Sequence, residues 1–149
     1  MTMIEPSRGQ PPWHIWAVGG LGLLWNAYGC FDYTMSKIQG DIYLRQVGMT
    51  AGQIAHFNAM PAWMTAVWAI GVWGALLGSV LLLLRRRLAA PVFLVSLLAY
   101  VASLFYTYMV APLAEMNTPA IMIMQVVIFA FGVGFVVYAL VQAKAGALR

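Results

Sequence analysis

The chain has 149 residues, of which 63% are hydrophobic and only 8% are charged, and its formal net charge is +4. Soluble domains carry about 25% charged residues, so a soluble core could not hide this much apolar surface, and the composition predicts a membrane protein. The basic residues flank apolar segments, which is a signal of membrane topology and not of nucleic-acid binding. The single cysteine excludes an internal disulfide, a CxxC redox motif and a cysteine-rich metal site.

The N-terminal stretch MTMIEPSRGQPP is polar, and it lacks a short apolar core followed by a small-residue cleavage site. It is not predicted to be a signal peptide, so the first apolar segment is expected to remain as a transmembrane helix. A helix needs about 20 mainly apolar residues to cross a bilayer. Four segments qualify: 13–34, 61–84, 90–111 and 119–142. The sequence therefore predicts an all-α membrane protein, with residues 1–149 forming one bundle of four transmembrane helices.

A long polar loop, residues 35–60, follows the first predicted span. Thr50 and Gln53 match a capping box, which is typical of a helix start. After them, three apolar residues recur at a spacing of three, as on one helix face: Ile54, Phe57 and Met60. We expect a short amphipathic helix here, lying on the outer membrane surface, with His56 more exposed than these apolar neighbours.

The distribution of Lys and Arg predicts the orientation. If the chain crosses four times, six basic residues fall on one side: Arg8, Arg85, Arg86, Arg87, Lys144 and Arg149. Only Lys37 and Arg45 fall on the other. Both termini and the turn at Arg85, Arg86 and Arg87 are therefore predicted to be cytoplasmic, while the loops at 35–60 and 112–118 face outward. A second interpretation of the arginine turn is a specific site for anionic lipids.

Polar residues interrupt the apolar spans at similar depths. With a rise of about 1.5 Å per residue, Asn26 of the first span and Gln125 of the fourth lie level in the outer half of the membrane. Three further side chains reach nearly the same depth: Trp68, Ser103 and Tyr106. We expect these groups to form a polar layer joined by interhelical hydrogen bonds. In this interpretation Asn26 is a packing residue bonded to Gln125.

Asp32 lies near the outer end of the first span, where water can solvate a carboxylate, and it is the better candidate for contact with a ligand, ion or partner. The full set of such candidates is Asp32, Asn26, Tyr106 and Gln125. Small residues accompany them: Gly22 and Gly29 share the helix face of Asn26, and Gly74 and Gly78 form a GxxxG in the second span. This spacing allows helix backbones to approach closely.

Catalytic patterns are not found in the sequence. It has no nucleotide-binding loop, no Ser-His-Asp set and no pair of acids in a common cleft. His14 and His56 lie near opposite membrane faces and so cannot hold a haem or a metal together. We therefore expect a protein that is not an enzyme and that carries neither a cofactor nor a metal.

The stretch PAWMTAVWAIGVWGALLGSVLLLLRRRLAAPVFLVSLL, with LLWNAYG in the first span, resembles a family of small four-span proteobacterial inner-membrane proteins. The label sugar transporter is sometimes attached to this family. The matching features are Pro61, Trp63, the glycines of the second span, the arginine turn, Pro91, Phe93 and Ser96. The resemblance covers most of the chain and implies a four-span fold in the bacterial cytoplasmic membrane, with no established catalytic residues. The family's outer loop is richer in acidic residues than TAGQIAHFNAM is, so what this loop recognises is expected to differ.

Two non-enzymatic functions remain open. The first is an accessory or structural subunit of a membrane complex, whose partners are the lipid bilayer and other membrane subunits or further copies of itself, with no nucleic acid. The alternative is a transporter or channel for a small solute such as a sugar, acting as an oligomer because four helices enclose little volume. The small multidrug carriers also have four spans, but they place a Glu deep in the first span, whereas the only acid in this first span is Asp32.

Overall fold

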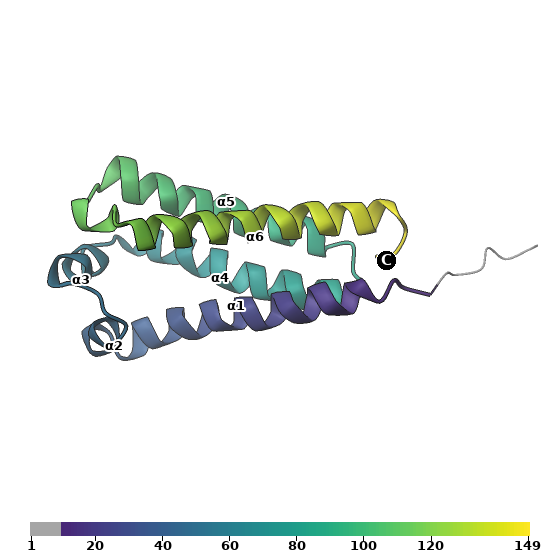
Figure 1. Ribbon diagram of the computed structural model, residues 1–149, viewed down its shortest axis with the longest axis horizontal. Coiled ribbons are helices and arrows are strands. Elements are labelled where there is room, and N and C mark those ends of the chain that lie inside the picture. The colour runs from purple at the N-terminus through teal and green to yellow at the C-terminus, as the bar shows by residue number, and fades with distance from the viewer. Residues whose placement is uncertain (1–9) are drawn as a thin grey trace, which may run out of the picture.

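The computed structural model describes residues 10–149, which fold into helices without a strand. Four long helices form an elongated bundle, and two short helices cover one end of it (Figure 1). The long helices are α1 (His14–Ile38), α4 (Ala62–Leu83), α5 (Ala89–Phe105, continued by a π-helical turn, Tyr106–Val110) and α6 (Pro119–Lys144). The short ones are α2 (Asp41–Gln46) and α3 (Ala51–Asn58). Residues 1–9 lie outside the described residues. They include Arg8, which is used to predict the topology, and most of the stretch that is predicted not to be a signal peptide.

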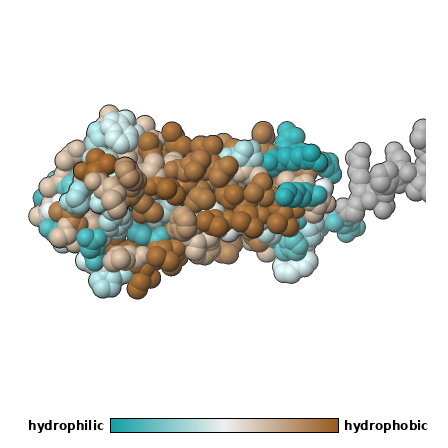
Figure 2. All heavy atoms as spheres, turned by 90° about the horizontal axis from the view of Figure 1, so that it is seen from above, coloured by the Kyte–Doolittle hydropathy of each residue, from teal (hydrophilic) through white to brown (hydrophobic). Residues whose placement is uncertain are grey.

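Within residues 10–149, three helical segments are long and apolar enough to cross a membrane: Ala62–Leu83, Ala89–Val110 and Pro119–Lys144. Only 11% of the most apolar part of the last segment is buried inside the chain, so most of its apolar surface faces outward. Figure 2 shows the result, a mainly hydrophobic middle between more hydrophilic ends. These are the features of a multi-pass membrane protein. The first predicted span does form a continuous helix, α1. Asn26 and Asp32 interrupt its apolar sequence, and α1 is not among the three apolar segments.

Local sequence signals explain several helix starts. The predicted capping box of α3 is confirmed, because the Thr50 hydroxyl accepts from the Gln53 amide at 3.2 Å and the Gln53 side chain accepts from the Thr50 amide at 3.0 Å. In α6, Pro119 occupies the first turn, where its missing N–H has no partner to lose. The preceding residue, Thr118, caps the helix by accepting from the Ile121 amide at 3.4 Å.

The long helices pack in chain order. The contact between α4 and α5 is the most extensive, followed by those of α1 with α4 and of α5 with α6. The predicted GxxxG lies in the closest contact: a Cβ on Gly78 would come within 2.6 Å of the Phe93 ring, and one on Gly74 within 3.3 Å of Ser96 Cβ. Only glycine lets α4 approach α5 this closely.

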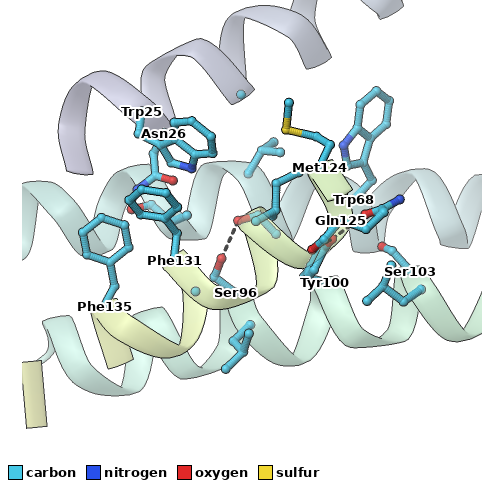
Figure 3. A pocket seen from close by; sticks show the side chains of 18 of the residues that line it. Trp25, Asn26, Trp68, Ser96, Tyr100, Ser103, Met124, Gln125, Phe131 and Phe135 are labelled. Atoms are coloured by element: carbon cyan, nitrogen blue, oxygen red, sulfur yellow. Dashed lines mark hydrogen bonds between the residues drawn. The ribbon is translucent and has the colours of Figure 1, made fainter. Parts of the chain in front are cut away.

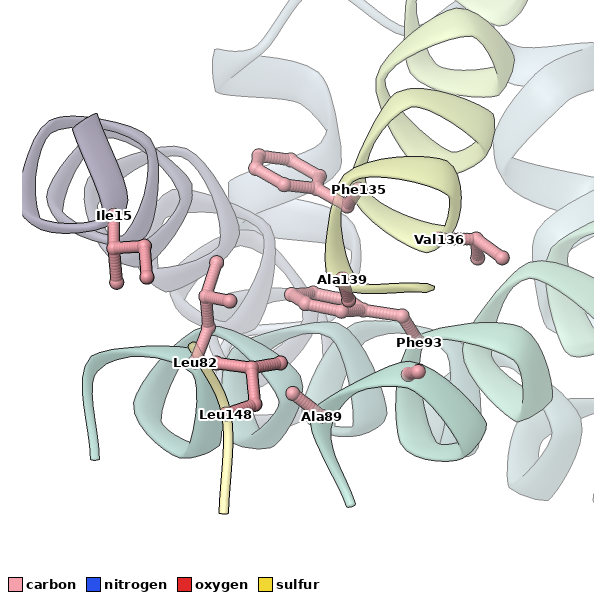
Figure 4. Packing of buried hydrophobic residues seen from close by; sticks show 9 residues of the cluster. Ile15, Leu82, Ala89, Phe93, Phe135, Val136, Ala139 and Leu148 are labelled. Atoms are coloured by element: carbon pink, nitrogen blue, oxygen red, sulfur yellow. The ribbon is translucent and has the colours of Figure 1, made fainter. Parts of the chain in front are cut away.

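The hydrophobic core lies at the end of the bundle that carries the C-terminus (Figure 4). Its buried residues come from all four long helices and from the C-terminal tail: Ile15, Leu82, Ala89, Ala90, Phe93, Phe135, Val136, Ala139 and Leu148. Leu148 is 1% exposed, so the tail is an integral part of this core.

Backbone hydrogen bonds hold the tail against the arginine turn. The Arg149 amide donates to the Arg85 carbonyl at 2.6 Å, and the Arg87 amide donates to the Arg149 carbonyl at 2.8 Å. The side chains of Arg85 and Arg87 also donate to the carbonyls of Ala147 and Leu148, at 3.0 and 3.2 Å. The arginine turn and the C-terminus therefore lie together at one end of the molecule.

The loop at 35–60, for which the sequence predicted one helix, contains two, α2 and α3. Tyr43 and Leu44 of α2 and Ile54 of α3 are buried in a small second core. His56 is half-buried, as are Phe57 and Met60, so the predicted contrast in exposure holds only against Ile54. The reason is that α3 folds onto the bundle, where the His56 ring lies 6.5 Å from that of Tyr106 and its Nε2 is buried without a hydrogen-bond partner in the described part of the chain.

Candidate functional site

A cavity of about 520 Å³ lies between the four long helices, in the half of the bundle near α2 and α3 (Figure 3). Its volume is within the range of small-molecule sites, about 300–1,000 Å³. Residues of α1 from 25 to 32, of α4 from 68 to 75, of α5 with its π-helical turn from 93 to 107, and of α6 from 124 to 135 contribute to its wall. Most of this wall is apolar or aromatic, with a small number of polar groups.

The predicted polar layer largely corresponds to this cavity. Asn26, Trp68, Ser103 and Gln125 all line it. Tyr106 does not: it is buried, and its ring packs edge-on against Trp63 with centroids 5.6 Å apart. The helical rise predicts the depth of Tyr106 but not the direction of its side chain. The ring points toward Trp63 at the start of α4 and toward His56 of α3. The structure therefore brings three of the four candidate residues, Asn26, Asp32 and Gln125, to one site.

Asn26 bonds to α4. Its Nδ2 donates to Ser79 Oγ at 2.9 Å and to the Ala75 carbonyl at 3.2 Å. The predicted partner of Asn26, Gln125, is therefore wrong, because the Asn26 side chain points to α4, along which α1 packs. The Asn26 side chain ties α1 to α4 at the edge of the cavity.

Gln125 has a partner that the sequence prediction missed. The Tyr100 hydroxyl donates to the backbone carbonyl of Gln125 at 2.9 Å and also contacts its side-chain Oε1. Tyr100 belongs to a row of polar residues that all line the cavity: Ser96, Tyr100, Ser103 and Thr107. Their spacing of four, three and four places them on one face of a helix. That periodicity is visible in the sequence and identifies the polar face of α5.

Asp32 lies at the end of the cavity nearest α2, half-buried, and its Oδ1 accepts a hydrogen bond of 2.8 Å from the Tyr43 hydroxyl. Tyr43 is on α2 and is 7% exposed. Burial raises the pKa of Tyr43 to about 12, with smaller contributions from its hydrogen bond to Asp32 and from the negative charge there. The pair positions the carboxylate between the second small core and the cavity.

Aromatic rings border the end of the cavity that is nearest the arginine turn. Phe93 and Phe135 stack with centroids 5.3 Å apart and an interplanar angle of 12°. The Phe131 ring lies 6.1 Å from that of Phe135. Beyond this stack lies the buried core that includes Leu148. The Phe93–Phe135 stack therefore lies between the cavity and the end that carries the arginine turn.

The cavity opens sideways, between α1 and α6. The exposed lining residues belong to these two helices: Tyr28 (67% exposed), Met124 (53%) and Phe131 (36%). The two helices diverge toward the end that carries α2 and α3 (Figure 1). Contacts between them include the stacking of Trp25 on Phe131, with centroids 4.8 Å apart, and the approach of His14 Nδ1 to the Tyr138 hydroxyl at 2.5 Å. The exposed part of the cavity wall therefore lies between these two helices.

The described titratable side chains near the cavity do not form a metal site. Within residues 10–149, no three His, Cys, Asp or Glu side chains come together to hold a metal ion. Cys30 is buried and its thiol points to the Val72 carbonyl at 3.3 Å, which is a helix-packing contact. The site is a mostly apolar chamber with one carboxylate and several amide, hydroxyl and indole groups. Comparison of the chain with protein-family models, with curated proteins and with solved structures finds no match.

Proposed function

We propose that the chain is a non-enzymatic, four-span protein of the bacterial cytoplasmic membrane that takes a small, mostly apolar solute into the cavity between its helices and acts as a carrier for it. The observation that carries this proposal is the cavity itself, about 520 Å³, closed toward one end of the bundle and open between α1 and α6. The sequence predicts that four helices enclose little volume. A cavity of this size within one chain supports a solute carrier that needs no oligomer to form its binding site.

The length and surface of α1 support a fourth span. Its 25 residues extend over about 37 Å at 1.5 Å per residue, enough to cross a bilayer core of about 30 Å. Large apolar side chains on it point outward: Leu21, Leu24 and Phe31. Its polar groups face the other helices, where Asn26 has hydrogen-bond partners and Asp32 bonds to Tyr43. An α1 that crosses the membrane hides these groups from lipid.

The charge distribution supports the orientation. Arg85, Arg86, Arg87, Lys144 and Arg149 gather at one end of the bundle, and an excess of Lys and Arg marks the cytoplasmic side. The resemblance to small four-span proteobacterial inner-membrane proteins favours the same location. In this orientation the cavity lies in the outer half of the membrane, and transport requires the Phe93–Phe135 stack to open toward the cytoplasm.

The test is to identify small molecules that remain bound to the chain. The wild-type protein is extracted from its native membrane into lipid nanoparticles, and the bound compounds are identified by mass spectrometry. Leu104→Trp places a large side chain on the cavity wall, whereas Leu98→Trp places the same side chain on an outward face of the same helix. We expect a compound that is present with wild type and Leu98→Trp and lost with Leu104→Trp. A set of bound compounds that is the same in all three would contradict the carrier proposal.

A second candidate function is that of an accessory subunit, and one observation favours it. A shallow apolar groove runs along the membrane-facing side of the seam between α1 and α6, lined by Val18, Leu21, Ala130, Phe131, Gly134, Phe135 and Tyr138. Ala130 and Gly134 lie one turn apart, and a Cβ on Gly134 would meet nothing within 4 Å. Small residues at this spacing suit contact with another transmembrane helix. A partner chain that co-purifies with wild type and is lost with Gly134→Leu would support this function.

A further inference from the structure

We propose that the cavity selects an organic cation: a lipophilic ammonium-type or phosphonium-type molecule that enters from the outer half of the bilayer and is bound by Asp32 and the aromatic rings beside it. This inference rests on the proposed function, because it assigns the chemical class of the solute that the cavity takes.

Charge is the first argument. Of the 22 residues that line the cavity, Asp32 is the only one with a charged side chain, and no Lys or Arg lines it. The hydrogen bond from Tyr43 uses Oδ1, and no described residue donates a hydrogen bond to Oδ2. A carboxylate at the edge of a low-dielectric chamber attracts a cation and repels an anion, because the Coulomb energy grows as the dielectric constant falls.

The rings beside the carboxylate are the second argument. Trp25 and Tyr28 precede Asp32 by seven and four residues, so all three share one face of α1, and Trp68 lines the cavity from α4. The faces of indole and phenol rings attract cations. Trp68 already shows this property: the Lys37 ammonium lies 5.7 Å from its ring centroid and 5.0 Å from that of Phe57. Lys37 does not line the cavity, and within residues 10–149 its ammonium forms no salt bridge with Asp32; its described contacts are with Thr65 and the rings of Phe57 and Trp68.

The route of entry is the third argument. The mouth between α1 and α6 is bordered by exposed apolar side chains, among them Tyr28 and Met124, which are 67% and 53% exposed. A small, strongly hydrated cation would lose its water there without finding polar groups to replace it. A cation that carries its own apolar groups partitions into the bilayer, passes between the two helices, and places its charge near Asp32 while its apolar part fills the chamber.

The test uses two probes of the same shape and opposite charge, tetraphenylphosphonium and tetraphenylborate, and a neutral relative, triphenylphosphine oxide. Equilibrium binding is measured on the full chain in nanodiscs of zwitterionic lipid. We expect saturable binding of the phosphonium and no saturable binding of the borate. Asp32→Asn should weaken phosphonium binding at least about tenfold, the equivalent of 1.4 kcal/mol, and leave binding of the neutral probe unchanged. Asp41→Asn is the matched control, because Asp41 bonds to Asn58 in the outer loop and does not line the cavity.

The outcomes separate this inference from the function on which it rests. Equal binding of the phosphonium and the borate to the wild-type chain overturns the cation proposal without any variant, so a misfolded Asp32→Asn cannot hide the result. Binding of the neutral probe that Leu104→Trp abolishes, without preference for the cation, keeps the cavity as a solute site and rejects Asp32 as its counter-ion. Saturable binding of none of the three probes rejects the organic-cation class, while the compounds retained from the native membrane still decide the proposed function.

Discussion

The Tyr43 hydroxyl donates a 2.8 Å hydrogen bond to Asp32, and this bond joins the loop at 35–60 to the cavity. Tyr43 belongs to α2, a helix of six residues, and Asp32 to α1. The bond gives a buried phenol its partner and holds one oxygen of the carboxylate in place. The loop therefore contributes to the position of the one charged group in the cavity wall.

The Tyr43 pair predicts a pH dependence. The folded chain favours the protonated phenol, since the pKa of Tyr43 is raised from 10.0 to about 12. Its contribution to the free energy of unfolding is fully present below pH 10 and is lost as the pH rises from 10 toward 12. Between pH 9 and pH 11 the free energy of unfolding should therefore fall by about 1 kcal/mol less in Tyr43→Phe than in wild type. Denaturation of the purified protein at the two pH values measures this difference. Tyr28→Phe changes an exposed phenol and is the control. If the free energy of unfolding fell equally between pH 9 and pH 11 in Tyr43→Phe and in wild type, Tyr43 would not be the source of the alkaline loss.

Asn26 should contribute to stability through its bond to Ser79. Interhelical hydrogen bonds in membranes average about 0.6 kcal/mol, so Asn26→Leu, which loses two, should lower the free energy of unfolding by about 1 kcal/mol. Ala27→Leu changes an exposed neighbour on the same helix and should have little effect. A double-mutant cycle with Ser79→Ala measures the pair directly. A coupling energy indistinguishable from zero would show that the Asn26–Ser79 bond is not important for packing.

Two glycine substitutions should have opposite effects. Gly78→Ala places a Cβ within 2.6 Å of the Phe93 ring, and overpacking of this kind costs about 1–3 kcal/mol. Gly20→Ala meets nothing within 4 Å, and the higher helix propensity of alanine should leave the protein as stable as wild type or slightly more stable. Thermal unfolding of both variants gives the comparison. Equal stability of Gly78→Ala and Gly20→Ala would contradict the close packing of α4 against α5 at Gly78.

The C-terminal tail should stabilise the end of the bundle that carries the arginine turn. Leu148 is 1% exposed in the core, so Leu148→Ala leaves a cavity there and should cost about 2–5 kcal/mol. Leu140→Ala is the control, because Leu140 is 46% exposed on α6. Both are measured by denaturation under the same conditions. Equal losses of stability in the two variants would mean that the tail does not pack as described.

The orientation is tested by thiol labelling of whole cells. In a Cys30→Ala background, Gln46→Cys places a thiol on α2 and Lys144→Cys places one at the end of α6; both positions are exposed. A reagent that cannot cross the membrane should label Gln46→Cys directly and Lys144→Cys only after the cells are permeabilised. Labelling of both thiols in intact cells would overturn an arrangement with four crossings and a cytoplasmic C-terminus.

The sequence by itself determined where the long helices run. The predicted spans 61–84 and 119–142 correspond to α4 and α6 within a few residues at each end, and the capping box at Thr50 forms as predicted. These features depend on residues that are close together in the chain: an apolar run long enough for a bilayer, a proline in the first turn, a side chain that caps the nearest free amide. Each of them can therefore be read without knowing the rest of the fold.

Only the tertiary structure decided which helices are neighbours and which way their side chains point. The helical rise placed Asn26 and Gln125 at one depth, but Asn26 bonds to Ser79 on α4 and Gln125 to Tyr100 on α5. Tyr106 has the expected depth and lies outside the cavity. Depth follows from position along a helix, whereas a side chain's partner depends on the order and rotation of packed helices. These are set by contacts between residues far apart in the sequence, such as Gly78 with Phe93 and Trp25 with Phe131.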